Sequence, residues 1–135
     1  MKFETTKQVK SWLRGLALLN RDLEMKTGFY LRLQRDCRDL GVVARHHEAY
    51  YLDKIEELHK RMQQIGEDVE RLMECLDPEE RAILTARYIK HLMWDAMEFY
   101  VHFSRRHAIR IHDRALKKLI GQEVEADVYR KKDGN

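Results

Sequence analysis

The sequence has few of the residues that make turns and few of the cysteines that crosslink small secreted folds. Its 135 residues include one proline, six glycines and two cysteines. An all-β sandwich or barrel needs many more turn-forming residues, and a doubly wound α/β fold needs short Val- and Ile-rich runs between its helices, which are missing here. Since 44% of the residues are hydrophobic, wholesale disorder is excluded as well. The chain is therefore predicted to be all-α.

Long apolar segments are missing too. The longest apolar run is the four residues 16–19, whereas a membrane-spanning helix needs about 20. Residues 1–10 are polar and charged, so no signal peptide is predicted. Cys37 and Cys75 are far apart and lie in helical patterns, which favours free, half-buried thiols in a reducing compartment. We expect a soluble, cytoplasmic protein without a membrane partner.

Sequence signatures of catalysis are absent as well. There is no glycine-rich phosphate loop, no nucleophile elbow and no CxxC motif. None of the seven histidines forms a pair four residues apart with a nearby carboxylate at the spacing of a zinc protease. We therefore expect a protein that is not an enzyme, with no catalytic residue, no metal ion and no cofactor.

Two rows of mostly apolar residues dominate the first half of the chain. Both alternate spacings of three and four residues over about four heptads, which is the pattern of a coiled-coil seam. The first row is Trp12, Leu16, Leu19, Leu23, Lys26, Tyr30, Leu33, Cys37 and Leu40; the second is Tyr51, Ile55, Leu58, Met62, Ile65, Val69, Leu72 and Leu76. Gly41 follows the first row, where a left-handed residue commonly ends a helix. The pattern predicts a long antiparallel helical hairpin over residues 1–75.

The hairpin leaves two questions open. Gly28 interrupts the first row, and because glycine costs a helix interior about 0.5–1 kcal/mol relative to alanine, a kink or a break is expected there. Lys26 on the seam fits such a break or a side chain that snorkels to solvent. The heptads also do not distinguish a seam that closes within one chain from one that forms a homo-oligomer through residues 12–76 or docks a partner helix.

The second half predicts a compact unit of three helices over residues 76–121. Asp77 is a good N-cap and Pro78 suits the first helical position, so a first helix should begin there and run to about Leu92. A short helix is expected over residues 94–101 and a third after Ser104, another N-cap. The third helix places Ala108, Ile111, Ala115 and Leu119 on one face, at core spacing. Residues 122–135 are expected to form a tail that is partly disordered.

The third predicted helix is strongly basic. Residues 104–120 contain six cations and one acid. A short helix, a tight turn and a cationic helix form the layout of a helix-turn-helix, whose second helix enters the major groove of DNA. Arginine suits guanine edges and phosphates, so Arg105, Arg106 and Arg110 are predicted to lie at or near base edges. The full predicted DNA-binding set is Ser104, Arg105, Arg106, His107, Ile109, Arg110, Arg114, Lys117 and Lys118, with Arg114, Lys117 and Lys118 at phosphates. His107 and His112 are expected to make polar contacts near the DNA.

Two blocks of this region resemble region four of bacterial sigma factors. The resemblance covers about 45 residues, from Leu76 to Ile120, and places Glu98 and His102 where that family usually has alanine and glycine. The matching residues are Leu76, Glu80, Arg81, Ile83, Leu84, Arg87 and Tyr88 in the first block and the run Ser104–Leu119 in the second, with its closing Ala115, Leu116, Lys118 and Leu119. A sigma-like region behind a helical N-terminal part is similar to the ArpU/RinA-type transcription activators of phages and prophages.

The resemblance implies a DNA-binding activator that acts at late-gene promoters in a bacterial host cell or at its nucleoid. Its partners would be double-stranded DNA and RNA polymerase, together with a second copy of the chain. Arg106 stands where sigma factors often have an acid, which implies that a different base sequence is read. Two alternatives stay open: a protein-interaction module that binds RNA polymerase or another phage protein through the hairpin, and a small-terminase-like DNA-packaging subunit.

Overall fold

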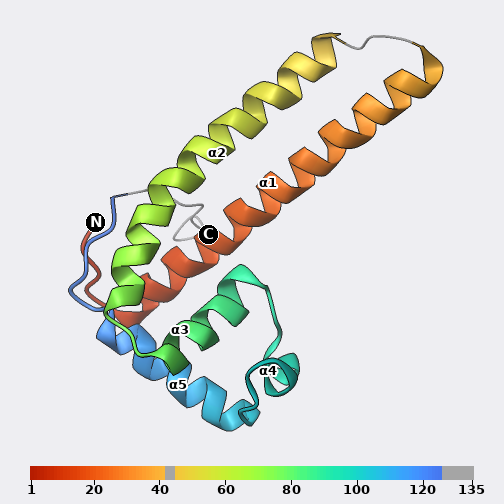
Figure 1. Ribbon diagram of the computed structural model, residues 1–135. Coiled ribbons are helices and arrows are strands. Elements are labelled where there is room, and N and C mark those ends of the chain that lie inside the picture. Colours follow the sequence, from red (N-terminus) through yellow and green to blue (C-terminus); the bar gives the residue numbers. More distant parts are fainter. Residues whose placement is uncertain (42–44, 126–135) are drawn as a thin grey trace.

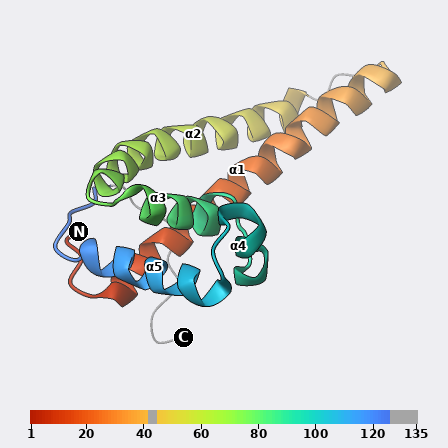
Figure 2. The ribbon, with the colours of Figure 1, turned by 60° about the horizontal axis from the view of Figure 1, so that its bottom comes forward.

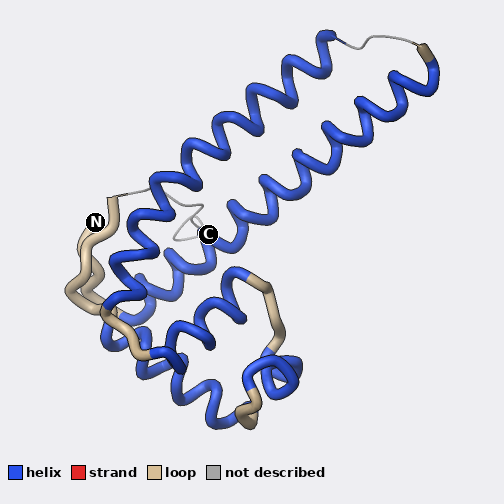
Figure 3. The backbone as a smooth tube through the Cα atoms, viewed as in Figure 1, coloured by secondary structure: helices blue, strands red, loops and turns tan. Residues whose placement is uncertain are grey.

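The computed structural model describes residues 1–41 and 45–125 and is all-helical, as predicted. Its elements are α1 (Thr6–Leu40), α2 (Arg45–Glu74), α3 (Pro78–Leu84), the π-helical turn η1 (Thr85–Ile89), α4 (Trp94–Val101) and α5 (Arg105–Lys118). In these residues the only pairing of β type is one isolated bridge between Lys2 and Glu123. Figures 1 and 3 show the long helices α1 and α2 side by side and the shorter elements gathered at one end of them.

The two long helices run antiparallel, and their predicted apolar rows supply the contact between them (Figure 1). Leu58, Ile65 and Leu72 of α2 are buried, as are Leu16 and Leu19 of α1. Both ends of α1 are set by local chemistry, which the sequence predicted at the C-terminal end. The Thr5 hydroxyl accepts a hydrogen bond from the Gln8 N–H, and Gly41 ends the helix with a φ of 65°.

Of the kink or break expected at Gly28, the break does not occur, because α1 is one helix from Thr6 to Leu40. The cost of one glycine is small beside the packing of a 35-residue helix. Lys26 remains on the seam and is partly exposed, with its ammonium 3.2 Å from the Asp22 carboxylate one turn earlier. The side chain therefore snorkels toward solvent, which was the alternative to a helix break at this position.

Burial is uneven along the hairpin. The base of the hairpin, where α1 begins and α2 ends, is buried, with Trp12 and Leu16 almost fully covered. Leu40 at the tip is 75% exposed. The base is buried because the later helices pack on it: Leu84, Tyr88 and Leu119 belong to the same apolar cluster as the hairpin residues. Residues 1–75 and 76–121, predicted as two units, therefore share one core. This shared core fixes the orientation of α3, α4 and α5 relative to α1.

The first helix after the hairpin begins as predicted and ends early. The Asp77 carboxylate accepts from the Glu80 N–H at 3.0 Å, and the Glu80 carboxylate accepts from the Asp77 N–H at 2.9 Å, which makes a capping box at the start of α3. Helical structure then stops at Ile89 rather than near Leu92. The Lys90 N–H bonds to the Thr85 carbonyl five residues back, and His91 adopts a left-handed conformation with a φ of 59°. This π-turn redirects the chain toward α4.

Part of the predicted tail is ordered. Residues 121–125 lie antiparallel to residues 1–3: the Gly121 N–H donates to the Phe3 carbonyl at 2.7 Å, and the Val124 N–H donates to the Met1 carbonyl at 2.9 Å. Phe3 and Val124 are both buried in the core at the base of the hairpin. The remainder of the expected tail, residues 126–135, lies outside the described residues.

Candidate nucleic-acid interface

The segment from α4 to α5 has the local geometry of a helix, a three-residue turn and a second helix. α4 has the bounds that the sequence predicted, and α5 begins after Ser104 as predicted. His102 ends α4 in a left-handed conformation, with a φ of 59° and a ψ of 25°. Ser104 then caps α5, because its hydroxyl accepts a hydrogen bond from the His107 N–H at 3.2 Å. Histidine thus occupies the conformation for which glycine is the usual residue.

One face of α5 is buried as its spacing predicted. Ala108, Ile111, Ala115 and Leu119 are each at most 1% exposed. Ala108 and Ile111 share an apolar cluster with Met97 of α4 and residues of α3 and η1. Because this face is covered by the other helices, the opposite face of α5 points away from the core. Figure 2 shows α5 along the outside of the molecule, at the end opposite the tip of the hairpin.

The outward face of α5 presents cations that have no acidic partner among the described residues. Arg106, Arg110 and Lys117 are all exposed, and their spacing of four and seven residues places them on one side of the helix. In the described part of the chain, no carboxylate lies within ion-pair distance of any of the three. Ile109 beside them is half-buried. No described side chain therefore compensates their charge, and they face outward toward an anionic partner.

Two further predicted contacts lie at the start of α5 and are partly engaged. The Arg105 guanidinium lies 3.0 Å from the Asp95 carboxylate of α4, and both side chains are exposed. A pair of this kind is weak in water, so Arg105 can exchange Asp95 for another anion. His107 is exposed, and its ring packs edge-on against Phe103, with 5.0 Å between the ring centroids.

The remaining two cations of the predicted set face the molecule itself. Arg114 and Lys118 lie on the side of α5 next to α3, where Arg114 Nε is 3.1 Å and Lys118 Nζ is 2.6 Å from the Glu80 carboxylate. The Asp77 carboxylate is 3.3 Å from Arg114 and 3.6 Å from Lys118. Hydrogen bonds to Glu80 raise the pKa of both Arg114 and Lys118. Their charge is therefore largely compensated within the chain.

Glu80 is the centre of this cluster and was not singled out from the sequence as a partner of α5. Its side chain is 0% exposed, and it accepts hydrogen bonds from the Asp77 backbone, Arg114 and Lys118. The Glu80 N–H in turn lowers the pKa of the Asp77 carboxyl, with Lys118 and Arg114 acting in the same direction. The spacing of Asp77 and Glu80 is that of a capping box, which was the available sequence signal.

The prediction that His112 makes polar contacts near DNA is wrong, because its side chain is buried. It is 2% exposed, and its Nε2 lies 2.7 Å from the Tyr88 hydroxyl while its Nδ1 lies 3.0 Å from the Asp113 carboxylate. Because a carboxylate only accepts, Nδ1 carries the proton and Nε2 accepts from Tyr88. Burial lowers the pKa of His112 and raises the pKa of Tyr88 to about 12. The spacing of four residues after Ala108 was the signal for this buried position.

Comparisons with known proteins add no relative. No family model, no curated protein and no solved structure matches this chain. Within residues 1–41 and 45–125, no helix is long and apolar enough to cross a membrane. No group of three or more His, Cys, Asp or Glu side chains in that same part of the chain could hold a metal ion. Cys37 and Cys75 are both free thiols, half-buried and exposed respectively.

Proposed function

We propose that this chain is a sequence-selective DNA-binding regulator in which α4, the turn at residues 102–104 and α5 form a helix-turn-helix. The observation that supports it most is the outward row of Arg106, Arg110 and Lys117 on a capped helix whose other face is buried. The major groove admits one helix, and the N-terminal residues of that helix reach the base edges. Arg106 lies in the first turn of α5 and Arg110 one turn later, so both lie at the end that would enter the groove.

The ion pairs of α5 divide the proposed contacts into two classes. Arg106 and Arg110 are proposed to read base edges, and Lys117 is proposed to bind a phosphate. Arg105 joins them if it leaves Asp95, which an exposed pair permits at low cost. Arg114 and Lys118 are proposed to hold α5 against α3, and their part in DNA binding is to orient the helix.

The biological setting we propose is the control of late genes in a phage or prophage. It rests on the resemblance of residues 76–120 to region four of sigma factors and to the ArpU/RinA-type activators. The left-handed conformation at His102 supports it, since this is the position of the glycine in the turn of that family. In this proposal RNA polymerase and a second copy of the chain are the protein partners, and the exposed end of the hairpin is available to either.

The experiment is a binding titration by fluorescence anisotropy. First, duplexes that bind the immobilised protein are selected from a pool of random DNA sequences. One labelled selected duplex, called the enriched duplex, is then compared with an unselected duplex, each at 50 mM and 200 mM salt. We expect tighter binding to the enriched duplex at both salt concentrations and a steep loss of affinity with salt for both duplexes. Arg110→Ala should weaken binding to the enriched duplex at least tenfold. Lys60→Ala, an exposed cation on α2, is the matched control and should leave it unchanged. Equal binding by the two variants would overturn the proposal.

A further inference from the structure

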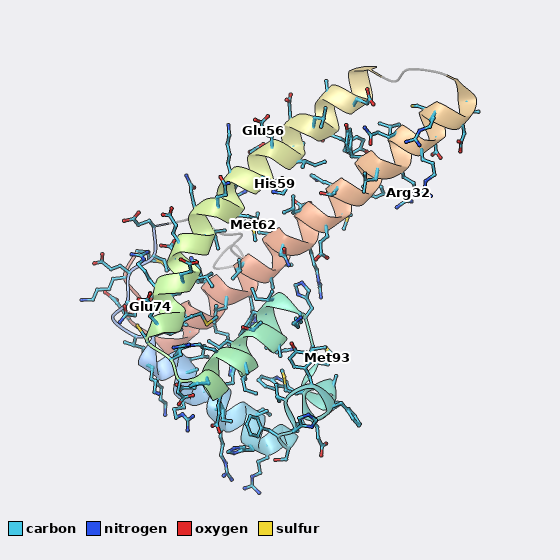
Figure 4. The ribbon with its side chains drawn as sticks, in the orientation of Figure 1. Arg32, Glu56, His59, Met62, Glu74 and Met93 are labelled. Carbon is cyan, nitrogen blue, oxygen red and sulfur yellow. The ribbon has the colours of Figure 1, made fainter. Side chains whose placement is uncertain are left out.

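A hollow of about 320 Å³ lies away from the outward face of α5, between α1 and the connection from η1 to α4. Figure 4 labels Met93, which lies in this connection. The residues that line the hollow combine cationic and apolar side chains. They include Arg14, Leu18 and Arg21 of α1 and Arg87, His91 and Met93 of the opposite wall. The hollow belongs to neither the helix-turn-helix contacts nor the seam of the hairpin.

The lining has a net positive charge that no acid of the described residues neutralises. It contains three arginines and no carboxylate. No acid of the described residues lies within ion-pair distance of Arg14 or Arg21. Arg87 is held in place, since its guanidinium donates to the Leu92 carbonyl at 2.9 Å and lies 5.0 Å from the centre of the Trp94 ring. The hollow is therefore suited to a ligand with carboxylates.

His91 adds an unfilled hydrogen bond. Its Nε2 is buried, and no group of the described chain bonds to it. Buried polar atoms without a partner are rare in folded proteins, and each one needs an explanation. His91 also lines the hollow and is one of two non-glycine residues with a positive φ in the described part of the chain. A carboxylate bound in the hollow would accept a hydrogen bond from an Nε2–H group once the His91 ring turned toward it, and this would complete the site.

The hollow opens onto a second heptad stripe of α1. Arg14, Leu18, Arg21 and Met25 follow one another at spacings of four, three and four, so they lie on one side of the helix. All four are exposed, unlike the seam that packs against α2. Leu18 and Met25 offer apolar contact, and the two arginines flank them. A stripe of this kind is the surface that an amphipathic helix recognises.

We propose that this stripe and the hollow dock an acidic amphipathic helix of a partner protein. An apolar side chain of the partner packs between Leu18 and Met93, and its carboxylates pair with Arg14 and Arg21 and reach His91. Charge complementarity selects the partner, and the apolar centre favours protein over nucleic acid, whose phosphates need no such contact. This site goes beyond the proposed function and does not depend on it.

The test uses two labelled 18-residue helical peptides without DNA. Both have leucine at the heptad a and d positions; one has glutamate at the flanking positions and the other has lysine. We expect the glutamate peptide to bind in the micromolar range and the lysine peptide to bind at least tenfold more weakly. Arg21→Glu should weaken binding of the glutamate peptide at least tenfold, whereas Lys60→Glu on α2 should change it less than twofold.

A second pair of variants tests the apolar centre. Leu18 and Leu31 are both exposed leucines of α1, at 48% and 55%, on different faces. Leu18→Ser should weaken peptide binding at least fivefold, and Leu31→Ser should leave it unchanged. Equal binding of the two peptides, no binding of the glutamate peptide, or equal effects of Leu18→Ser and Leu31→Ser would overturn the proposal. Loss of self-association in Leu18→Ser by sedimentation equilibrium would assign the surface to a second copy instead. A loss of DNA affinity in Arg21→Glu as large as in Arg110→Ala would assign it to nucleic acid.

Discussion

Glu80 shows how a single residue joins local and tertiary structure. Its carboxylate completes the capping box of α3 and also receives Arg114 and Lys118 from α5. A buried carboxylate is stable only when its oxygens are paired, and here three donors converge on it. The same side chain therefore starts one helix and holds another in place.

We expect Glu80→Ala to lower the free energy of unfolding by about 3 kcal/mol, because it removes charged hydrogen bonds from a buried site. Glu80→Gln should cost about 1 kcal/mol, because glutamine retains the capping hydrogen bond. Urea denaturation followed by circular dichroism measures both values. Glu56→Ala is the control, since that glutamate is exposed on α2 and lies outside the cluster. A value for Glu80→Ala that equals the control would contradict the role of the cluster.

His112 makes stability depend on pH. Burial lowers its pKa in the folded protein below the ordinary 6.5, so the unfolded chain takes up the proton first as the pH falls. The contribution of neutral His112 is complete above pH 6.5 and is lost as the pH falls toward the folded-state pKa. We expect the free energy of unfolding to decline between pH 7.5 and pH 5.5, and to decline less in His112→Gln. Urea titrations at the two pH values check this, and equal declines would exclude His112 as the source.

Arg106 and Lys117 should differ in how they affect DNA binding. Arg106→Ala is expected to cost about 1–3 kcal/mol of discrimination between the enriched and unselected duplexes, because it removes a base contact. Lys117→Ala should weaken binding to both duplexes alike and reduce the salt slope by about one, because it removes a phosphate contact. Anisotropy titrations over a series of salt concentrations separate the two outcomes. The same discrimination and the same salt slope in both variants would contradict the assignment of Arg106 to a base and Lys117 to a phosphate.

At the scale of elements, the prediction was most accurate where short-range chemistry decides. Ser104 is a strong N-cap, so the start of α5 followed from the sequence, as did both bounds of α4. The π-turn at residues 85–89 was missed, because its hydrogen-bond shift leaves no pattern in composition or spacing. The site was predicted only in part for the same reason. Helical periodicity separates the buried face of α5 from the exposed one, but it does not show that Arg114 meets Glu80 from another helix.

The turn between α4 and α5 has a strained residue that can be relieved. A left-handed conformation costs a residue with a Cβ roughly 1–2 kcal/mol, and glycine adopts it freely. His102→Gly should therefore raise the free energy of unfolding by about 1 kcal/mol. His107→Gly, another exposed histidine but inside α5, should lower it, because glycine weakens a helix. Parallel urea titrations measure the two changes, and a loss of stability in His102→Gly would contradict this account of the turn.

At the scale of the whole molecule, the hairpin and the shorter helices share one core. We therefore expect them to unfold together in a single cooperative transition. Trp12 lies in the core at the base of the hairpin, and Trp94 packs against the cluster beneath α5. Trp94→Phe and Trp12→Phe leave one tryptophan each, so fluorescence reports each region separately. In each variant, we expect the urea transition seen by fluorescence to coincide with the one seen by circular dichroism, which reports the whole molecule. A hairpin that melts apart from the helix-turn-helix would show two midpoints.

The antiparallel contact between residues 1–3 and 121–125 also has a consequence for biosynthesis. Phe3 is translated before its partners, because Gly121, Gln122 and Val124 follow it by more than a hundred residues. During translation the base of the nascent hairpin stays uncovered until nearly the whole described chain has emerged from the ribosome. Premature termination or slow translation near residue 121 would leave that apolar surface open to chaperones and proteases, so cellular yield should depend on completing this stretch.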